Sequence, residues 1–362
     1  MSGHGGRRRL VPAACCAAAL LTAVTACGGG GGKAAGSAGE LLTSTASDRQ
    51  DKLVAEAKKE KTLDWVTSFA GPVVDDIVKA FQAKYPFIHV KVNRGDEGAI
   101  IPQAIQEIQA KKPSGDVFES TASGALEFKD AGALVPYRSP NASKISGEFK
   151  VLDEDKNDLL LTDRISYISF GYNTTKIPKE AVPHTLEDLL DPALKGKLAI
   201  ETDTTSEEWI GAVLHKMGER RGEEFLAKLA KQQVSRTSLS GSAMMGLVAT
   251  GQYAASPSVF HNHEEQNKAK GAPVGWVPLD PVVANVGQLG ILAGGEHPAS
   301  AMLFIDFMTS AEGQKVLKGQ LYTPPEEKQP FDSWVPSRGA KDANSYNAEL
   351  KSWAALEKKY FG

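Results

Sequence analysis

Apolar positions along the chain recur first at helical spacing and then in alternation, and this switch repeats. Residues 47–61, SDRQDKLVAEAKKEK, carry an apolar stripe formed by Leu53, Val54 and Ala57, which predicts a helix. TLDWVTS then alternates in the manner of a strand. PVVDDIVKAFQAKYP returns to helical spacing, and FIHVKV follows it as a second strand. These stretches together predict a β-α-β unit.

The same succession of elements continues through the middle of the chain. A helix is predicted around residues 101–108, and a Pro/Gly turn leads from it into the short strand DVFE. Further elements are predicted in RISYISFGYN (strand), HTLEDLLD (short helix begun at Thr185), KLAIE (strand) and TSEEWIGAVLHKMGE (helix). Alternating strands and helices predict an α/β fold in which mainly parallel sheets are flanked by helices.

The loops that follow the predicted strands are the first places to look for a ligand site. In open α/β sheets, ligands bind beyond the carboxyl ends of the strands, at topological switch points. The loops concerned are Thr67 to Ala70 and Ser120 to Ala122.

The length of the chain and its repeated β-α-β pattern predict two lobes. The second lobe is expected to start near residue 164, with LLLTDRISY as the outward crossing and GWVPLDP as the return crossing. The predicted boundaries are 48–163 plus 274–325 for lobe 1 and 164–273 plus 326–362 for lobe 2.

The first 26 residues are expected to direct export. Three consecutive arginines, Arg7 to Arg9, precede the short apolar run VPAACCAAALLTAVTA, which is typical of a signal peptide covering residues 1–26. The sequence Val-Thr-Ala-Cys that ends at Cys27 resembles the lipobox of bacterial lipoproteins, which implies lipidation of Cys27 followed by a flexible linker over residues 27–47. The general secretory and twin-arginine routes both remain open.

The composition excludes several kinds of chemistry. Cys15 and Cys16 fall within the predicted signal peptide, so Cys27 is the only cysteine of the mature chain, which leaves no disulfide, thiolate metal site or cysteine nucleophile. Loss of three arginines and no acids changes the formal charge from -3 to -6. Because no Lys/Arg cluster is interleaved with aromatic residues, nucleic acid is not expected as a partner. We expect a monomer without a cofactor.

The familiar catalytic and metal motifs fail on inspection. HNHEEQN resembles the H-E-x-x-H zinc motif, but the position four after His263 is Asn267. DEDKND begins like a calcium loop, yet its sixth position is Asp158 and its twelfth is Arg164. The sequence holds no G-x-S-x-G elbow, P-loop or dinucleotide fingerprint. An enzyme is therefore not expected, and a secreted lipoprotein hydrolase is the rival function from another class.

Three groups of segments together resemble the extracellular solute-binding proteins of ABC importers, in the family that includes the ferric-ion, thiamine and phosphonate binders. The segments are KLVAEAKKEKTLDWVTSF with VKAFQAKYPFIHVKV and DVFESTASGALEFKDAGALVPY, then ISFGYNTTKIPKEAVPHTLEDLLDPALKGKLAI, and finally VGQLGILAGGEHPASAMLFIDFMTSAEGQKVL. They follow the family's order and cover most of the mature chain. The combination of the second and third segments is the most specific part of the resemblance.

The resemblance implies a fold and a function. Its fold is the type II periplasmic-binding-protein fold, in which two α/β lobes are joined by a hinge of crossing strands and close on a solute between them. It implies a lipid-anchored substrate-binding component at the extracytoplasmic face of the cell membrane, which delivers a small solute to an ABC permease.

Small hydroxyl residues at the predicted strand-to-helix transitions are the main candidates for binding the solute. Free N–H groups at helix starts favour carboxylate or phosphate oxygens, although Ser and Thr are also common helix caps. Asp203, Glu207 and Glu208 would instead suit a bound amine, so the sign of the solute's charge stays open. The candidates are Ser68, Phe69, Ser120, Thr121, Thr205, Ser206, Ser240, Ser242 and His261.

Ferric iron is the alternative ligand. The iron-binding members carry an adjacent tyrosine pair that corresponds to about His261 and Asn262, and a Glu that corresponds to Thr121 or, shifted by two, to Glu119. Their histidine near the first strand has no counterpart in WVTSFAG. The iron pattern is largely missing.

A softer divalent metal could in principle use His261 and His263 together with Glu264 or Glu265. If NHEEQNKAK opens a helix, however, His261 lies in the preceding loop and His263 in the first turn, which separates the two rings. His261 is therefore also a candidate hydrogen-bond donor to an organic solute.

Overall fold

A computed structural model of the protein describes residues 40–112, 114–239 and 241–362. The predicted signal peptide, Cys27 and Ser240 lie outside the described residues. The α-helices are α2 (Arg49–Glu60), α3 (Gly71–Lys84), α4 (Glu97–Gln109), α5 (Ala122–Asp130), α6 (Thr204–Met217), α7 (Glu219–Ala230), α8 (Ser242–Thr250), α9 (His261–Ala269), α10 (Pro298–Met308), α11 (Ala311–Gly319) and α12 (Ala343–Phe361).

The strands alternate with these helices over much of the chain. They are β1 (Thr62–Thr67), β2 (His89–Arg94), β3 (Val117–Thr121), β4 (Leu134–Val135), β5 (Lys150–Leu152), β6 (Asp158–Asn173), β7 (Ala199–Glu201), β8 (Ser235–Thr237), β9 (Ala255–Phe260), β10 (Val274–Val277), β11 (Val282–Leu292) and β12 (Ser333–Trp334). Six short 3-10 helices complete the description: η1 (Pro140–Lys144), η2 (Gly147–Phe149), η3 (Lys179–Ala181), η4 (Glu187–Leu190), η5 (Pro192–Leu194) and η6 (Pro336–Gly339).

Most of the predicted elements are confirmed, and one changes type. The helix predicted over 47–61 is α2, and the strand TLDWVTS is β1. The short helix predicted from Thr185 is the 3-10 helix η4, which begins two residues later, at Glu187. The carboxylate of Asp188 accepts the N–H groups of His184 and Thr185, which closes a tight turn, and a proline follows at position 192.

The main sheet combines parallel and antiparallel pairs in the order β10-β6-β11-β3-β1-β2. Strand β1 lies between β2 and β3 and is parallel to both, as the β-α-β pattern predicts. Strand β11 is antiparallel to β3 and to β6. Strands β7 and β8 form a second parallel pair. Leu198, the residue before β7, also forms a parallel bridge with Ala255, the first residue of β9.

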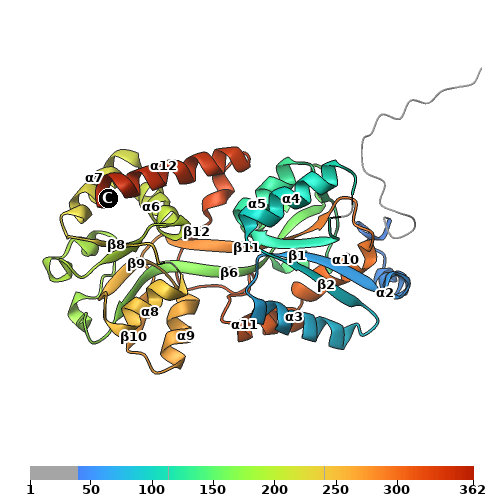
Figure 1. Ribbon diagram of the computed structural model, residues 1–362, viewed down its shortest axis with the longest axis horizontal. Coiled ribbons are helices and arrows are strands. Elements are labelled where there is room, and N and C mark those ends of the chain that lie inside the picture. The colour runs from blue at the N-terminus through green and yellow to red at the C-terminus, as the bar shows by residue number, and fades with distance from the viewer. Residues whose placement is uncertain (1–39, 113, 240) are drawn as a thin grey trace, which may run out of the picture. The chain divides into compact units, whose positions relative to one another are not determined.

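Two long strands, β6 and β11, run alongside one another (Figure 1). Their register joins Val283 to Ile168 at one end and Leu289 to Leu161 at the other, with an irregularity between Gly287 and Gln288. LLLTDRISY, the predicted outward crossing, lies within β6, whereas GWVPLDP, the predicted return crossing, begins in β10, which pairs with β6. The chain then continues into β11, which also pairs with β6.

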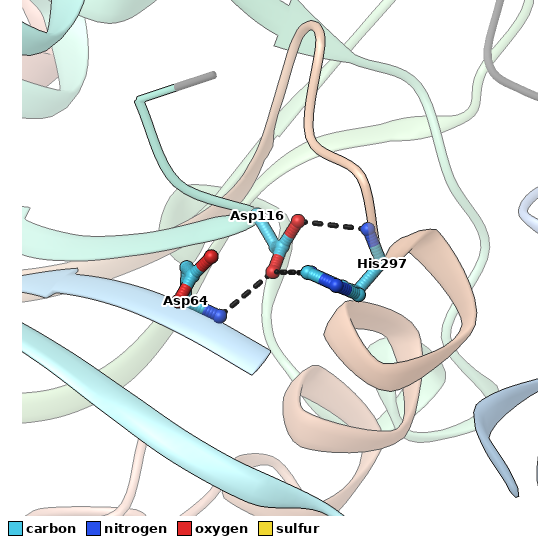
Figure 2. A group of neighbouring side chains, drawn as sticks. All are labelled: Asp64, Asp116 and His297. Atoms are coloured by element: carbon cyan, nitrogen blue, oxygen red, sulfur yellow. Dashed lines mark hydrogen bonds and ion pairs between the residues drawn. The ribbon is translucent and has the colours of Figure 1, made fainter. Parts of the chain in front are cut away.

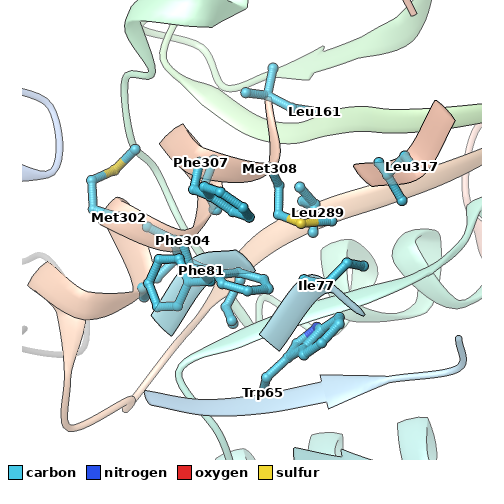
Figure 3. Close-up of a cluster of buried hydrophobic side chains, with 14 of the residues drawn as sticks. Trp65, Ile77, Phe81, Leu161, Leu289, Met302, Phe304, Phe307, Met308 and Leu317 are labelled. Atoms are coloured by element: carbon cyan, nitrogen blue, oxygen red, sulfur yellow. The ribbon is translucent and has the colours of Figure 1, made fainter. Parts of the chain in front are cut away.

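The long strands pass from one hydrophobic cluster to another. The first cluster contains Trp65, Phe81 and Phe304, whose rings pack at centroid separations of 4.9 Å (Trp65 to Phe304) and 5.1 Å (Phe81 to Phe304) (Figure 3). A second cluster is built by residues of β7, α6, α7 and α12. On β6, Ile165 belongs to the first cluster and Phe170 to the second. Val274 and Leu279 pack in clusters with residues of α6, α7, α8 and β9.

A polar latch secures the start of α10 to the beginning of strands β1 and β3. The carboxylate of Asp116 accepts the main-chain N–H of Asp64 at 2.7 Å and that of His297 at 2.9 Å, and lies 2.8 Å from Nδ1 of His297 (Figure 2). Glu60 accepts the N–H groups of Ala299 and Ser300, which are free at the start of the helix. The latch fixes the end of the sheet at which β1 and β3 begin.

None of the helices in the described part of the chain combines the length and apolar character needed to cross a bilayer.

Candidate functional site

A cavity of about 360 Å³ opens between the beginnings of α4, α5 and α6, beside strand β11 and the start of α12. The helix starts supply hydroxyls, amides and carboxylates, and β11 supplies the floor with residues 284–286. Apolar side chains of Ile101, Val286 and Leu350 also line the cavity. A concave space with a few polar groups on an apolar background is the usual form of a small-molecule site.

Glu97, the first residue of α4, organises one wall of the cavity. Its carboxylate accepts the hydroxyl of Ser68 at 2.8 Å, and it accepts both the N–H and the hydroxyl of Thr121 at 2.7 Å. The preceding residue, Asp96, caps the helix by accepting the N–H of Gly98. One carboxylate therefore holds the loop after β1 and the loop after β3 against the start of α4.

Glu208 of α6 lies in the wall formed by α6 and α12. It is 4% exposed, and it accepts the Tyr346 hydroxyl at 2.7 Å and the side-chain amide of Asn285 at 3.3 Å. Burial raises the pKa of Glu208 to about 7, and the hydrogen bonds from Tyr346 and Asn285 only partly offset that effect. Near neutral pH this carboxyl group is therefore divided between its charged and neutral forms.

The cavity is acidic. Glu97, Glu127 and Glu208 line it, and no lysine, arginine or histidine of residues 40–112, 114–239 and 241–362 does so. Burial, and then the charge of Glu97, raise the pKa of Glu127. The lining therefore favours positive over negative charge in whatever occupies the space.

Arg164 of β6 is not part of the cavity lining and is already paired. Its Nη2 lies 2.7 Å from the buried Glu119, and its guanidinium lies 4.5 Å from the Phe69 ring centroid and 5.2 Å from that of Tyr322. Burial raises the pKa of Glu119 and of the adjacent Asp163, although the charge of Arg164 opposes both shifts. The positive charge of Arg164 therefore stabilises the two buried carboxylates, Glu119 and Asp163, and is not available to a solute in the cavity.

Two of the candidate residues predicted from sequence come together in the cavity. Thr121 and Thr205 both line it, one at the start of α5 and the other at the start of α6. The N–H of Thr205 is taken by Asp203, the cap of its own helix. Ser68 lies next to the cavity through its bond to Glu97.

Other candidates are used within the protein. Ser120 and Ser206 are buried and donate their hydroxyls to main-chain carbonyls, Ser120 to Thr121 and Ser206 to Glu201 and Asp203. Phe69 is 2% exposed and belongs to the first hydrophobic cluster. Ser242 is exposed at the start of α8, outside the lining of the cavity.

His261 is the first residue of α9, whereas we predicted that it lies in the loop before the helix. Its ring lies 4.5 Å from that of Trp276, and burial lowers its pKa. Burial also lowers the pKa of His263, to about 4. Neither histidine is part of the cavity lining.

Two groups of side chains in the described residues bring potential metal ligands within 4.8 Å of one another. One joins His261 to Glu264 and Glu265, and does not include His263. The other is the latch, Asp64 with Asp116 and His297 (Figure 2), in which Asp116 is occupied by hydrogen bonds. His261 and His263 fall in separate positions, as expected if this segment forms a helix, because residues two apart on a helix point in different directions.

Four residues that line the cavity were not predicted from the sequence pattern: Glu97, Glu127, Asn285 and Tyr346. Glu97 follows a capping aspartate at a helix start, a pattern that could have drawn attention to it. Tyr346 comes from the last helix, more than 130 residues after Glu208, and no local pattern connects the two residues.

Comparisons with known proteins agree with the geometry. Residues 114–342 match the family described as bacterial extracellular solute-binding protein. An uncharacterized protein of Haemophilus influenzae is 27% identical over 246 residues, which cover 66% of this chain and 70% of that protein. The Fe(3+)-binding periplasmic protein of Serratia marcescens is 25% identical over 242 residues, which cover 64% and 69% of the two chains.

The fold is also found among solved structures. The periplasmic binding protein AfuA from Actinobacillus pleuropneumoniae, solved with exogenous fructose-6-phosphate bound, aligns with a TM-score of 0.61 and 24% identity, covering 83% of this chain and 98% of that one. This is the type II periplasmic-binding fold. With a family match over more than half its length, the chain belongs to the bacterial extracellular solute-binding proteins, the solute-binding components of ABC importers.

Proposed function

We propose that this protein is a lipid-anchored, monomeric subunit that captures a small organic solute in the cavity beside β11 and delivers it to a membrane permease. The observation that carries the proposal is the cavity itself, which is lined by the starts of α4, α5 and α6. Cys27 lies outside the described residues, and the lipobox-like sequence that ends there supports the anchor. The anchor would keep the protein at the extracytoplasmic face of the membrane.

The lobes would be those predicted from the sequence, 48–163 plus 274–325 and 164–273 plus 326–362. Helices α4 and α5 belong to the first lobe, and α6 belongs to the second. A solute that touches both walls gains contacts only when the lobes approach, so it shifts the population towards the closed form. Closure then signals to the permease that the protein is loaded.

Thr121 and Thr205 are the predicted residues that we assign to solute contact. Each lines the cavity from a different helix start, and together they offer a hydroxyl on either wall. Ser68 is assigned a supporting role, because its hydroxyl is bonded to Glu97.

The proposed function is tested by screening cationic, neutral and anionic solutes for a rise in Tm, followed by titration calorimetry. A true ligand should bind with a Kd near micromolar and reduce the radius of gyration in X-ray scattering. Thr205→Val should weaken binding about 10-fold, which corresponds to roughly 1.4 kcal/mol. If every ligand found leaves the radius of gyration unchanged, the capture-and-closure proposal is wrong.

Ferric-iron binding is the second candidate, because the Serratia marcescens relative is an Fe(3+)-binding periplasmic protein. Carboxylates are suitable ligands for a hard cation, and the cavity has three of them. Native mass spectra recorded before and after addition of excess ferric citrate separate the two candidates. An iron-sized gain that survives desalting supports iron, whereas its absence together with an organic ligand supports the first proposal.

A further inference from the structure

The charge of the cavity restricts the class of solute, given that the cavity is the binding site as proposed above. On the side of α4 and α5, the hydrogen bonds that Glu97 accepts from the described residues come from Ser68 and Thr121, which are neutral groups. Glu127 has no hydrogen-bond donor or cation within bonding distance of its carboxylate among the described residues. The charge of Glu97 acts on Glu127, so the two carboxylates lie close enough to repel each other.

The wall on the side of α6 is negative as well. Both groups that donate to Glu208, the Tyr346 hydroxyl and the Asn285 amide, are neutral. Asp203 and Glu207 act on Glu208 with the same sign of charge. Neither wall therefore contains a cation that would neutralise the carboxylates of the other.

The rest of the lining includes apolar side chains. Ile101, Val286 and Leu350 offer contacts to methylene groups rather than to charges. A solute that fits this distribution is positive at both ends and aliphatic in the middle. A phosphate or dicarboxylate would meet like charge on both walls.

We propose that the solute is a small dication with an aliphatic centre, such as a short linear diamine. One ammonium group would bind at Glu97 and Glu127, and the other at Glu208. Such a solute would also favour closure, because it replaces the repulsion between the two walls with attraction to a shared ligand. Each ammonium has three donors, which match carboxylate and hydroxyl acceptors on its wall.

The test uses the full-length chain carrying Cys27→Ala and four probes with the same four-carbon skeleton. These are 1,4-diaminobutane, 1-aminobutane, 1,4-butanediol and succinate. Titration calorimetry should show the diamine binding at least 10-fold more tightly than the monoamine. The diol and the dicarboxylate should show no heat of binding.

Glu127→Gln is the most informative variant, because this side chain is half-buried and makes no ion pair that the fold needs. It should weaken diamine binding about 10-fold while leaving monoamine binding less affected. Glu154→Gln removes the same charge from an exposed turn before β6 and should change neither affinity. Glu208→Gln provides a second variant on the other wall.

The outcomes separate the two proposals. If succinate or butanediol binds as tightly as the diamine, or if Glu127→Gln leaves the ratio of diamine to monoamine affinity unchanged, the dication proposal is wrong. If no probe binds but another organic solute binds and closes the lobes, only the dication proposal fails. If no solute of any charge binds, the proposed function fails with it.

Discussion

Both oxygens of the Glu97 carboxylate bond to Thr121, one to its main-chain N–H and the other to its hydroxyl, each at 2.7 Å. The pair joins two helix starts, since Thr121 is the residue from which α5 begins and Glu97 is the first residue of α4. One side chain thus sets the position of a residue that was predicted to contact the solute.

Glu97→Gln should weaken solute binding by about 10-fold and lower the free energy of unfolding by about 1 to 2 kcal/mol. The amide keeps one acceptor oxygen but places an NH2 group against a donor, so one of the bonds to Thr121 is lost. Calorimetry with the best ligand and urea unfolding measure the two effects. Glu107→Gln, near the end of the same helix, is the control, and an equal loss of affinity there would contradict the assignment.

Glu208 should make the stability of the empty protein fall as the pH rises from about 4.5 to about 7. Burial raises its pKa in the folded state to about 7, so the folded state holds a proton that the unfolded state has released. The stability associated with this proton is fully present below pH 4.5 and largely lost by pH 7, and amounts to roughly 3 kcal/mol.

Urea unfolding at pH 4.5, 6 and 7.5 tests this dependence in the wild type and in Glu208→Gln. The variant cannot titrate at this position, so its stability should decline less over the same range. Identical pH dependence in the two proteins would show that Glu208 does not titrate differently in the folded and unfolded states.

Arg164→Met should destabilise the protein by about 3 to 5 kcal/mol, because it leaves Glu119 and Asp163 buried without their cation. A Cβ at Gly287 would lie only 2.4 Å from Nη1 of Arg164, so the guanidinium fits tightly against β11. Arg220→Ala breaks an exposed pair with Glu224 and should cost less than about 0.5 kcal/mol. Thermal unfolding of the two variants compares their losses of stability. A similar loss in both variants would contradict the role of Arg164 in stabilising the buried acids.

His297→Ala should cost stability mainly below neutral pH. The hydrogen bond to Asp116 raises the pKa of His297, so the stabilisation is fully present below about pH 6.5 and is lost as the pH rises through the higher folded-state value. We expect a loss of about 1 kcal/mol at pH 6 that shrinks by pH 9, measured by urea unfolding. His89→Ala changes an exposed residue and should show no such trend.

The sequence was sufficient to predict elements whose pattern is local. Helix α2 and strand β1 follow directly from an apolar stripe and an alternation, and the family resemblance implied the fold. The exceptions came from contacts that periodicity does not describe. The turn at Thr185 depends on the side chain of Asp188, and the position of β11 depends on its pairing with β6.

Lining residues could be named from the sequence only where the position of a residue within its own strand or helix determines which way it faces. Thr121 and Thr205 were candidates because they lie at strand-to-helix transitions, and both line the cavity. Glu127 lies among the apolar residues of α5, and Tyr346 lies near the end of the chain. Only the tertiary structure brings these two residues into the same cavity lining. Ser206 was a reasonable candidate by the same rule, yet its hydroxyl binds main-chain carbonyls.

The pairing of β3 with β11 also affects the order in which the chain can fold. Strand β3 ends at Thr121 and its neighbour β11 begins at Val282, 161 positions later (282 minus 121). At a synthesis rate of about 5 to 20 residues per second, β11 follows β3 from the ribosome after about 8 to 32 seconds. Throughout that interval the N-terminal strands have an open edge, so this part of the protein completes its sheet only after most of the chain has been made.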